Sequence, residues 1–497
     1  MAMQFSSDGA DAIQRPLIAT PVGNSLTVPE ELDEIYEIER TTTFVAQHQC
    51  SKVALQFPDE LLVDSVTVAT KLEKASGTKV YILGDTSYGS CCVDEVAAEH
   101  VGADAVVHYG RACLSPCTRL PIMYVFGRKS VDVKSCVAAF RKLYPDPACH
   151  VVVLCDVVYH YIIGVLKSLL CPDYPHVSFS SIVLDGTSTC ISSTGDSNSR
   201  VTSDEVEVVK FGRQFAIDKY LGIGAYGMFY IGGESPTLTN FMMIWNQCAF
   251  STFNPHTGEG RHETLNVNRA LMKRFYLIEL ARDAKVVGIL VGTLGVVDYL
   301  SIIQHLRDRI RRAGKKSYTF VMGKLNTAKL ANFLEVDIFV LVACPENSLL
   351  DSSDFYRPVV TPYEMDMACN TAWEWTGQYV TDYRDLLPGG RSFVEFPIGN
   401  ATDREVPDVS LITGELRLTH LSQTQAVEDP ACTSLAHRSD GTLAEKGLAA
   451  SFLGSRSWKG LERRLGETPV TKAVEGRRGI AIAYEDEVCN SSNQDVL

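Results

Sequence analysis

The chain is organised around one strand-to-helix turn, Gly84-Asp85-Thr86-Ser87-Tyr88-Gly89-Ser90-Cys91-Cys92-Val93-Asp94. The run before it, Lys79 to Leu83, has the apolar character of a buried parallel strand, and Glu95 to His100 predicts the first turns of a helix. In an open α/β sheet, ligands bind beyond the carboxyl ends of the strands, and a helix N-terminus there lowers the pKa of a thiol. We therefore expect chemistry at the two adjacent cysteines.

The composition is that of a soluble globular protein. The chain has 497 residues, 45% hydrophobic and 21% charged, which predicts about three domains. Its formal net charge is −14, and Arg307 to Lys316 is the one basic run, so we expect no nucleic-acid ligand and favour a basic protein partner. The sequence has neither a signal-peptide pattern nor an apolar run of membrane-spanning length, so we expect a cytoplasmic protein with no membrane contact.

The 15 cysteines are not expected to form disulfides in such a reducing compartment. Most of them are expected to be small buried apolar side chains, and a few to bind a metal or a cluster.

Three similar units of alternating strands and helices follow one another along the chain. This alternation predicts βαβ crossovers and parallel sheets, hence three small α/β domains over residues 31–128, 129–283 and 284–399. The expected strands are Lys52 to Phe57, Lys79 to Leu83, Ala103 to Tyr109 and Leu120 to Phe126, then His150 to Leu154, Val177 to Leu184, Gly227 to Ile231 and Phe250 to Phe253, then Lys285 to Val291, Ser317 to Met322, Val336 to Val342 and Pro358 to Thr361.

Polar segments flank and interrupt these units. Residues 1–30 are expected to be a mobile arm, and the stretch rich in Ser and Thr from Thr187 to Asp204 a surface insertion in the second domain. Residues 400–497 are expected to be a poorly ordered tail, in which Ser451 to Leu461 and Gly479 to Asp486 are apolar enough to dock as short peptides.

Four cysteines follow ends of predicted strands. Cys91 and Cys92 follow the second strand of the first unit, Cys113 follows its third, and Cys344 follows the third strand of the third unit. If the domains share a centre at these strand ends, three thiolates converge there from distant parts of the chain. Thiolate-only ligation suits zinc or an iron–sulfur cluster.

Zinc sites usually contain close pairs of cysteines, and the spacing Cys113-x₃-Cys117 has no matching second pair. Scattered thiols better fit a cluster held by three cysteines with one iron left open. The alternative is that these strand-end cysteines are simply buried.

Four motifs in combination resemble the diphthamide synthesis family of iron–sulfur proteins. They are Leu55 to Leu61 (LQFPDEL), Gly84 to Asp94, His108-Tyr109-Gly110 and Val342-Ala343-Cys344-Pro345, and the resemblance extends from about Tyr36 to Pro397. It implies three similar α/β domains around a central [4Fe-4S] cluster, with one cysteine from each domain in the symmetric archaeal form. Members of the family cleave S-adenosylmethionine to a 3-amino-3-carboxypropyl radical, which adds to one histidine of translation elongation factor 2.

The sequence departs from the family pattern in its second domain. The region where the family has a cysteine, Val208 to Arg213, contains none, and Cys190 and Cys248 stand in other contexts. The resemblance therefore implies that Cys113 substitutes, so that Cys92, Cys113 and Cys344 hold the cluster. Cys91 is the alternative to Cys92.

The resemblance implies a transferase subunit in a heterodimer with a paralogous catalytic subunit, diphthamide biosynthesis protein 1, together with elongation factor 2 and an electron-donor protein. Either this chain cleaves S-adenosylmethionine itself, or its cluster relays electrons to the cluster of the partner. We prefer the relay, because the missing cysteine changes where an open iron would point. A non-enzymatic scaffold that stabilises the partner and docks elongation factor 2 is the alternative.

Overall fold

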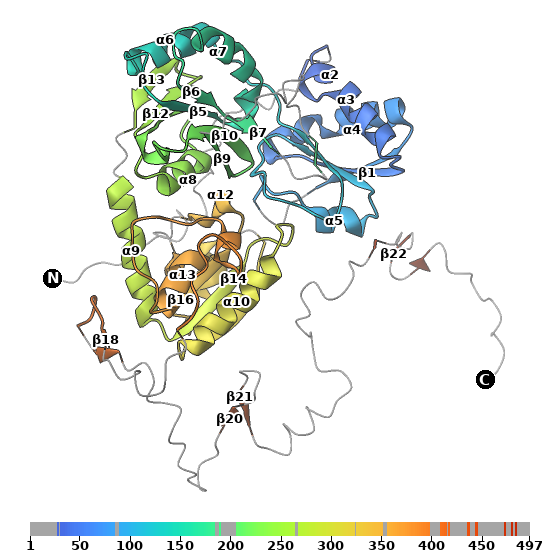
Figure 1. Ribbon diagram of the computed structural model, residues 1–497. Helices are drawn as coiled ribbons and strands as arrows, with labels where there is room; N and C mark the ends of the chain where they lie inside the picture. Colours follow the sequence, from blue (N-terminus) through green and yellow to red (C-terminus); the bar gives the residue numbers. More distant parts are fainter. Residues whose placement is uncertain are drawn as a thin grey trace, which may run out of the picture.

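The structure of the protein is a computed structural model. It describes residues 27–28, 30–84, 89–183, 188–189, 205–263, 267–323, 325–350, 355–397, 408–414, 416–417, 435–437, 443–445, 472–473, 479–480 and 483–484. Figure 1 shows the described chain as three α/β assemblies arranged in a triangle, coloured blue, green, and yellow to orange along the sequence.

The first sheet is parallel throughout and has the strand order β2-β1-β3-β4-β8. Its strands are β1 (Lys52–Gln56), β2 (Lys79–Leu83), β3 (Ala105–Tyr109), β4 (Ile122–Val125) and β8 (Ser188–Thr189). The helices of this part of the chain are α2 (Leu32–Ile35), α3 (Ile38–Gln47), α4 (Ser65–Ser76) and α5 (Glu95–His100), with the 3-10 helix η1 (Asp59–Asp64). Because β8 belongs to a later part of the chain, two sequence units share this sheet.

The second sheet has the order β13-β12-β11-β5-β6, and only its edge strand β13 is antiparallel. Its strands are β5 (Val151–Cys155), β6 (Val177–Phe179), β11 (Gly227–Ile231), β12 (Phe250–Asn254) and β13 (Glu259–His262). Its helices are α6 (Val133–Leu143), α7 (Ile163–Leu170) and α8 (Pro236–Ile244). The 3-10 helices η2 (Val157–Ile162) and η3 (Ile223–Ala225) also belong to this part.

The third sheet is parallel and has the order β15-β14-β16-β17. Its strands are β14 (Val286–Val291), β15 (Lys316–Val321), β16 (Ile338–Val342) and β17 (Val359–Val360). Its helices are α9 (Val267–Asp283), α10 (Tyr299–Arg312), α11 (Thr327–Ala331), α12 (Pro345–Ser348) and α13 (Pro362–Cys369), followed by the 3-10 helix η4 (Tyr383–Leu386).

The central strands form because both faces of a parallel sheet are covered, which favours unbroken runs of β-branched and apolar residues. Val107, Val153 and Val340, one from each sheet, have no exposed surface. Two helices begin at clear capping signals: Thr361 and Glu364 form a reciprocal capping box at α13, and Ser235 caps α8, whose first residue is Pro236. The predicted α/β class with parallel sheets is confirmed, whereas the domain boundaries 31–128, 129–283 and 284–399 stay predictions.

An antiparallel hairpin was not predicted from the sequence. Strands β9 (Glu205–Lys210) and β10 (Arg213–Asp218) pair with each other, and β10 also pairs with β7 (Ser181–Ile182). The hairpin turn is Phe211-Gly212, and both residues have positive φ, 51° and 64°. This conformation is typical of a two-residue type I′ turn, and the alternating EVEVVK before it was a usable strand signal.

Several segments that the sequence singled out lie largely or wholly outside the described residues. They are most of the arm at 1–30, most of the insertion at 187–204, the peptide Ser451 to Leu461 and most of the tail at 400–497. Three short antiparallel pairs are described in the tail: β18 (Asp408–Val409) with β19 (Leu416–Arg417), β20 (Leu435–His437) with β21 (Leu443–Glu445), and β22 (Gly479–Ile480) with β23 (Ala483–Tyr484).

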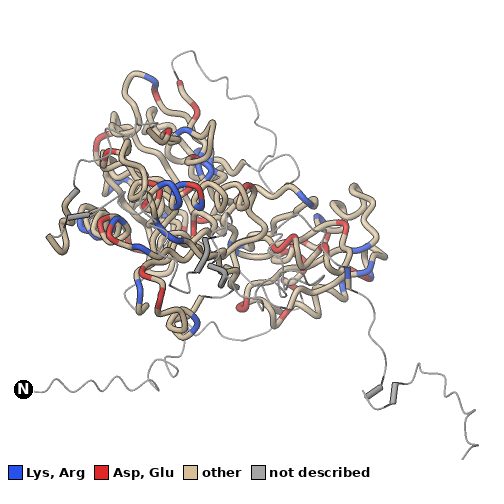
Figure 2. The backbone as a smooth tube through the Cα atoms, turned by 90° about the horizontal axis from the view of Figure 1, so that it is seen from below, with Lys and Arg blue, Asp and Glu red and all other residues tan. Residues whose placement is uncertain are grey.

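Charges of both signs are interspersed along the tube in Figure 2. The basic run at 307–316 is partly engaged inside the third assembly: Arg307 donates to Thr319, Arg309 to the carbonyl of Val394, and Lys315 to the carbonyl of Ala284. Within the described ranges, no helix combines the length and the apolar character that crossing a membrane requires.

Candidate metal centre

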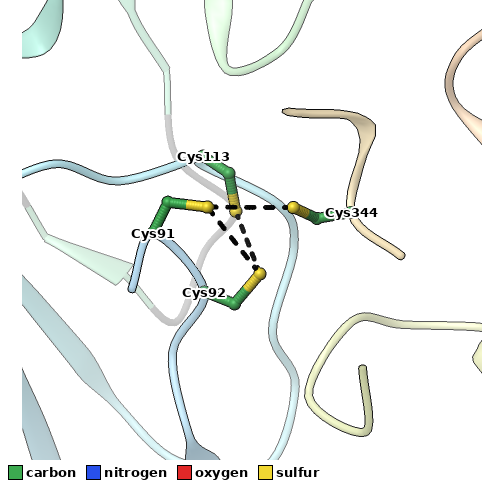
Figure 3. Close-up of side chains that lie close together, drawn as sticks. All are labelled: Cys91, Cys92, Cys113 and Cys344. Atoms are coloured by element: carbon green, nitrogen blue, oxygen red, sulfur yellow. Dashed lines mark hydrogen bonds between the residues drawn. The ribbon is translucent and has the colours of Figure 1, made fainter. Parts of the chain in front are cut away.

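Four cysteine thiols meet where the first and third sheets face each other. Cys91 and Cys92 lie between β2 and α5, Cys113 follows β3, and Cys344 is the residue before α12. Their Sγ atoms all lie within 4.8 Å of one another, and all four residues are buried. Figure 3 shows the four side chains pointing toward one another from these separate segments. The structure thus brings together the three thiols predicted from the sequence, Cys92, Cys113 and Cys344, and adds Cys91 to them.

The group has the dimensions of a compact thiolate site. The Sγ atom of Cys91 lies 3.8 Å from that of Cys344 and 4.0 Å from that of Cys92, and the Sγ atoms of Cys92 and Cys113 are 3.9 Å apart. Four sulfurs placed tetrahedrally about one ion at 2.3 Å would be about 3.8 Å apart. A four-iron cluster is larger than one ion, so its thiolates have to stand further apart than these.

Backbone hydrogen bonds hold the cysteine turns together. The Cys113 amide donates to the carbonyl of Cys91 at 3.0 Å. The side chain of Gln56, at the end of β1, donates to the carbonyl of Cys92 at 2.8 Å and accepts from the amide of Asp94 at 2.9 Å. Gln56 therefore clamps the turn on both sides of Val93. Gln56 lies in the motif Leu55 to Leu61, and its side-chain contacts with a distant turn carry no local signal in the sequence.

The pKa values of the four thiols are shifted in opposite directions. Hydrogen bonds from the thiols of Cys344, Cys91 and Cys92 lower the pKa of Cys113 well below its ordinary value. The hydrogen bond to Cys113 is in turn the largest cause that raises the pKa of each of the other three. Binding a metal or cluster at this site would therefore release protons.

Polar side chains touch the thiols at the edge of the group. The Asn347 amide nitrogen lies 3.3 Å from the Sγ atom of Cys91, and the Ser115 hydroxyl lies 3.3 Å from the Sγ atom of Cys113. A Cβ at Gly89 would collide with the Asn347 amide, so glycine is needed for this approach. Hydrogen bonds to sulfur are one means by which a protein tunes a bound cluster.

The β9–β10 hairpin, which belongs to the antiparallel sheet β7-β10-β9, meets this region through packing, and its described residues 205–218 include no cysteine. The turn residue Gly212 lies against Leu114, and a Cβ at Gly212 would be 2.5 Å from the Cβ of Leu114. Leu114 itself has a positive φ of 55° and follows Cys113 directly. The stretch Val208 to Arg213, where the resemblance implied a missing ligand, is thus the hairpin that supports the Cys113 loop.

The other cysteines weighed from the sequence lie elsewhere. Cys117 is buried and donates to the Ser115 carbonyl at 3.6 Å, and Cys248 donates to the Ile223 carbonyl at 3.2 Å; neither belongs to the four-thiol group. Cys190 is outside the described residues.

Comparisons with known proteins agree on one family. The sequence profile described as "Putative diphthamide synthesis protein" matches residues 57–380. The chain is 58% identical to 2-(3-amino-3-carboxypropyl)histidine synthase subunit 2 of Xenopus laevis, with 98% of this chain and 100% of that protein covered. It is 43% identical to the Homo sapiens protein of the same name, with 98% and 99% covered.

A solved structure has the same fold. It is Dph2 from Pyrococcus horikoshii with a 4Fe-4S cluster, which matches with a TM-score of 0.51 at 20% identity and covers 73% of this chain and 96% of that chain. The matching profile and the full-length relatives lead to one conclusion: this chain belongs to the diphthamide synthesis protein family.

Proposed function

We propose that this chain is the iron–sulfur subunit of a complex that transfers a 3-amino-3-carboxypropyl group from S-adenosylmethionine to a histidine of translation elongation factor 2. The observation that carries the proposal is the group of four buried thiols, in a chain whose relatives are named as subunit 2 of a histidine synthase. The related Dph2 structure is described with a 4Fe-4S cluster, which supports the same cofactor here. The partner in this proposal is the paralogous catalytic subunit, diphthamide biosynthesis protein 1, and the complex works in the cytoplasm.

Cys92, Cys113 and Cys344 are the proposed ligands, with Cys91 as the alternative to Cys92. The chemistry of the donor set fits the cofactor, because iron–sulfur clusters are held by thiolates and all four thiols are shielded from water. The sulfurs would have to move apart from their separations of 3.8 to 4.0 Å to hold it. A bound cluster would supply one-electron redox chemistry. The chain itself would exclude water and place the Asn347 amide and the Ser115 hydroxyl against the sulfurs.

The proposed role is to relay an electron from a donor protein to the cluster of the partner, rather than to cleave S-adenosylmethionine. In support, the position at which the resemblance implies a second-domain ligand is the turn Phe211-Gly212 of the β9–β10 hairpin. This turn packs on Leu114 and carries no metal-binding side chain. A relay needs a buried redox centre and a suitable potential, and it does not need an open coordination position.

Metal and sulfide analysis tests the ligand set. In protein isolated without oxygen together with its paralogue, Cys113→Ala and Cys344→Ala should each remove most of the iron and sulfide that this chain contributes. Cys149→Ala is the matched control, since Cys149 is only partly buried and lies outside the thiol group. Full cluster content in Cys113→Ala would contradict the proposal that Cys113 takes the place of the cysteine that the family has in its second domain.

A single-turnover assay tests the relay. With labelled S-adenosylmethionine and a weak physiological reductant, Cys113→Ala plus Cys344→Ala should lose transfer to elongation factor 2. With dithionite, which can reduce the partner's cluster directly, the same complex should still transfer the group. Loss of transfer under dithionite, with the partner's cluster intact, would place the radical chemistry in this chain instead.

A second candidate is a scaffold whose thiols bind one structural metal ion. The separations of 3.8 to 4.0 Å favour it, because they match those about a single tetrahedral ion. Protein of this kind would be colourless and would contain zinc without sulfide. Visible absorbance and metal content of the protein isolated without oxygen therefore separate the two candidates.

A further inference from the structure

A charged junction lies two residues from each of two proposed ligands. Arg111 precedes Cys113 by two residues, Glu346 follows Cys344 by two, and their side chains form an ion pair. Thr237, on α8 of the second assembly, donates to the Glu346 carboxylate at 2.9 Å and accepts from Arg111 at 3.2 Å. Asn240, one turn further along α8, donates to the Pro345 carbonyl at 2.9 Å. Segments that follow strands of all three sheets therefore meet at this pair.

The charges of the Arg111–Glu346 pair act on the nearby thiols. The Glu346 side chain is 8% exposed, and the Arg111 side chain is 37% exposed. Burial raises the pKa of Glu346, the Arg111 charge lowers it, and the Cys113 thiol raises it again. Arg111 in turn interacts electrostatically with Cys91. In such a partly buried setting, charges are less screened than at a surface.

We propose that the Arg111–Glu346 pair positions the Cys113 and Cys344 loops against each other and sets the electrostatic potential at the thiol centre. This inference rests on the proposed function, because it assigns the pair a role toward the cluster. Arg111 and Glu346 are positioning residues here: Arg111 orients the Cys113 loop from the first sheet, and Glu346 orients the Cys344 loop from the third. Thr237 links both to the second assembly.

The charges of the pair predict shifts of opposite sign. Reduction adds an electron to the centre, so a more positive surrounding stabilises the reduced state. Glu346→Gln removes a negative charge beside the guanidinium of Arg111 and should raise the midpoint potential. Arg111→Gln removes a positive charge beside the carboxylate of Glu346 and should lower it. The double variant Arg111→Gln plus Glu346→Gln restores neutrality and should lie near the wild type.

Two further variants separate charge from geometry. Arg111→Lys keeps the charge and should keep the wild-type potential even if less cluster is retained. Thr237→Val removes hydrogen bonds but no charge, so it should reduce cluster retention without shifting the potential. Asp173→Asn, which breaks the exposed Arg141–Asp173 pair on the second assembly, is the matched control and should change neither quantity.

The experiment is a redox titration followed by electron paramagnetic resonance, on the complex with the paralogue. The partner's signal is identified in the complex that carries Cys113→Ala plus Cys344→Ala and is subtracted. Opposite shifts for Glu346→Gln and Arg111→Gln, with the double variant near the wild type, support the inference. Shifts of the same sign, no shift, or a shift of equal size in Thr237→Val overturn it.

The same samples distinguish failure of the inference from failure of the proposed function. Wild-type protein that lacks an iron–sulfur signal of its own overturns the proposed function and the inference together. A normal wild-type cluster without opposite shifts overturns the inference alone. If a single variant retains too little cluster to titrate, the charge-conserving variants Arg111→Lys and Glu346→Asp test the proposal instead. Both should keep the wild-type midpoint potential. A shift in either variant contradicts the proposal.

Discussion

Cys91 and Cys92 are adjacent in the sequence, yet their thiols have different nearest partners. The Cys91 Sγ lies 3.8 Å from that of Cys344, and the Cys92 Sγ lies 3.9 Å from that of Cys113. The Cys92 carbonyl is also fixed by Gln56, whereas the Cys91 thiol is already engaged by the Asn347 amide. The Cys91 side chain thus lies toward the Cys344 loop, and the Cys92 side chain lies toward the Cys113 loop.

We predict that Cys92→Ala removes more bound iron than Cys91→Ala does. The reason is that the backbone clamp at Cys92 holds its thiol in place for binding, while Cys91 has a hydrogen-bond partner without a metal. Gln56→Leu, which removes the clamp, should weaken iron retention about 10- to 100-fold, as loss of outer-sphere support commonly does. Iron content after anaerobic dialysis against a chelator measures all three variants. Equal loss in Cys91→Ala and Cys92→Ala would contradict the preference.

A half-buried histidine in η2, His160, predicts a pH dependence of stability. Burial, with a smaller contribution from the Arg213 charge, lowers the pKa of His160 to about 4. The unfolded chain takes up the proton near pH 6.5 and the folded chain does not, so stability is present above pH 6.5 and is lost as the pH falls toward 4.

Between pH 7.5 and 5.5 this effect should cost roughly 1 kcal/mol of the free energy of unfolding. We expect His160→Gln to show a correspondingly smaller drop in urea unfolding experiments at the two pH values. The same drop in wild type and variant would show that His160 is not the group responsible.

At the scale of elements, the β9–β10 hairpin contacts the Cys113 loop through Gly212. Gly212 has a φ of +64° and a side that faces Leu114, so an added methyl group meets both backbone strain and a collision. Gly258, in the turn between β12 and β13, has a φ of +70° with nothing within 4 Å of an added Cβ. Alanine substitutions at the two glycines therefore distinguish the cost of backbone strain from the cost of a collision with a neighbouring side chain.

We predict that Gly258→Ala costs about 1–2 kcal/mol, the strain of a left-handed residue. Gly212→Ala should cost about 1–3 kcal/mol more, because Leu114 must move. It should also lower iron retention, since Leu114 is the neighbour of Cys113. Thermal unfolding and iron content measure the two effects, and identical behaviour of both variants would argue against support of the Cys113 loop by the hairpin.

At the scale of the whole molecule, the relatives are named as a subunit, and large apolar side chains lie exposed on α9. Met272 is 73% exposed and Tyr276, one turn later, is 52% exposed. We predict that the chain expressed alone self-associates or is poorly soluble, and that co-expression with the paralogue gives a defined heteromer. Light scattering measures the mass of both preparations. A well-behaved monomer that the paralogue leaves unchanged would contradict this expectation.

The parallel strands and the cysteines that follow them can be predicted from local sequence patterns alone. Buried strands are readable because both faces must be apolar, so runs such as His150 to Leu154 and Val336 to Val342 carry the signal locally. The expectation that Lys79 to Leu83 is buried was wrong, because β2 is an edge strand in which only Leu83 is buried. The motifs around Cys91, Cys92 and Cys344 also carried the family resemblance. The hairpin at Phe211-Gly212 was readable too, through its turn residues, but was missed.

Which of these residues come into contact depends on the tertiary structure. Cys91 and Cys344 are separated by 253 positions, and their contact depends on how the first and third sheets pack, which no local pattern encodes. The same holds for Gln56 beneath Cys92 and for the junction of Arg111, Glu346 and Thr237. Hydrophobic periodicity specifies which face of an element is buried, whereas the position of a polar side chain relative to a distant loop is set by the packing of whole sheets against one another.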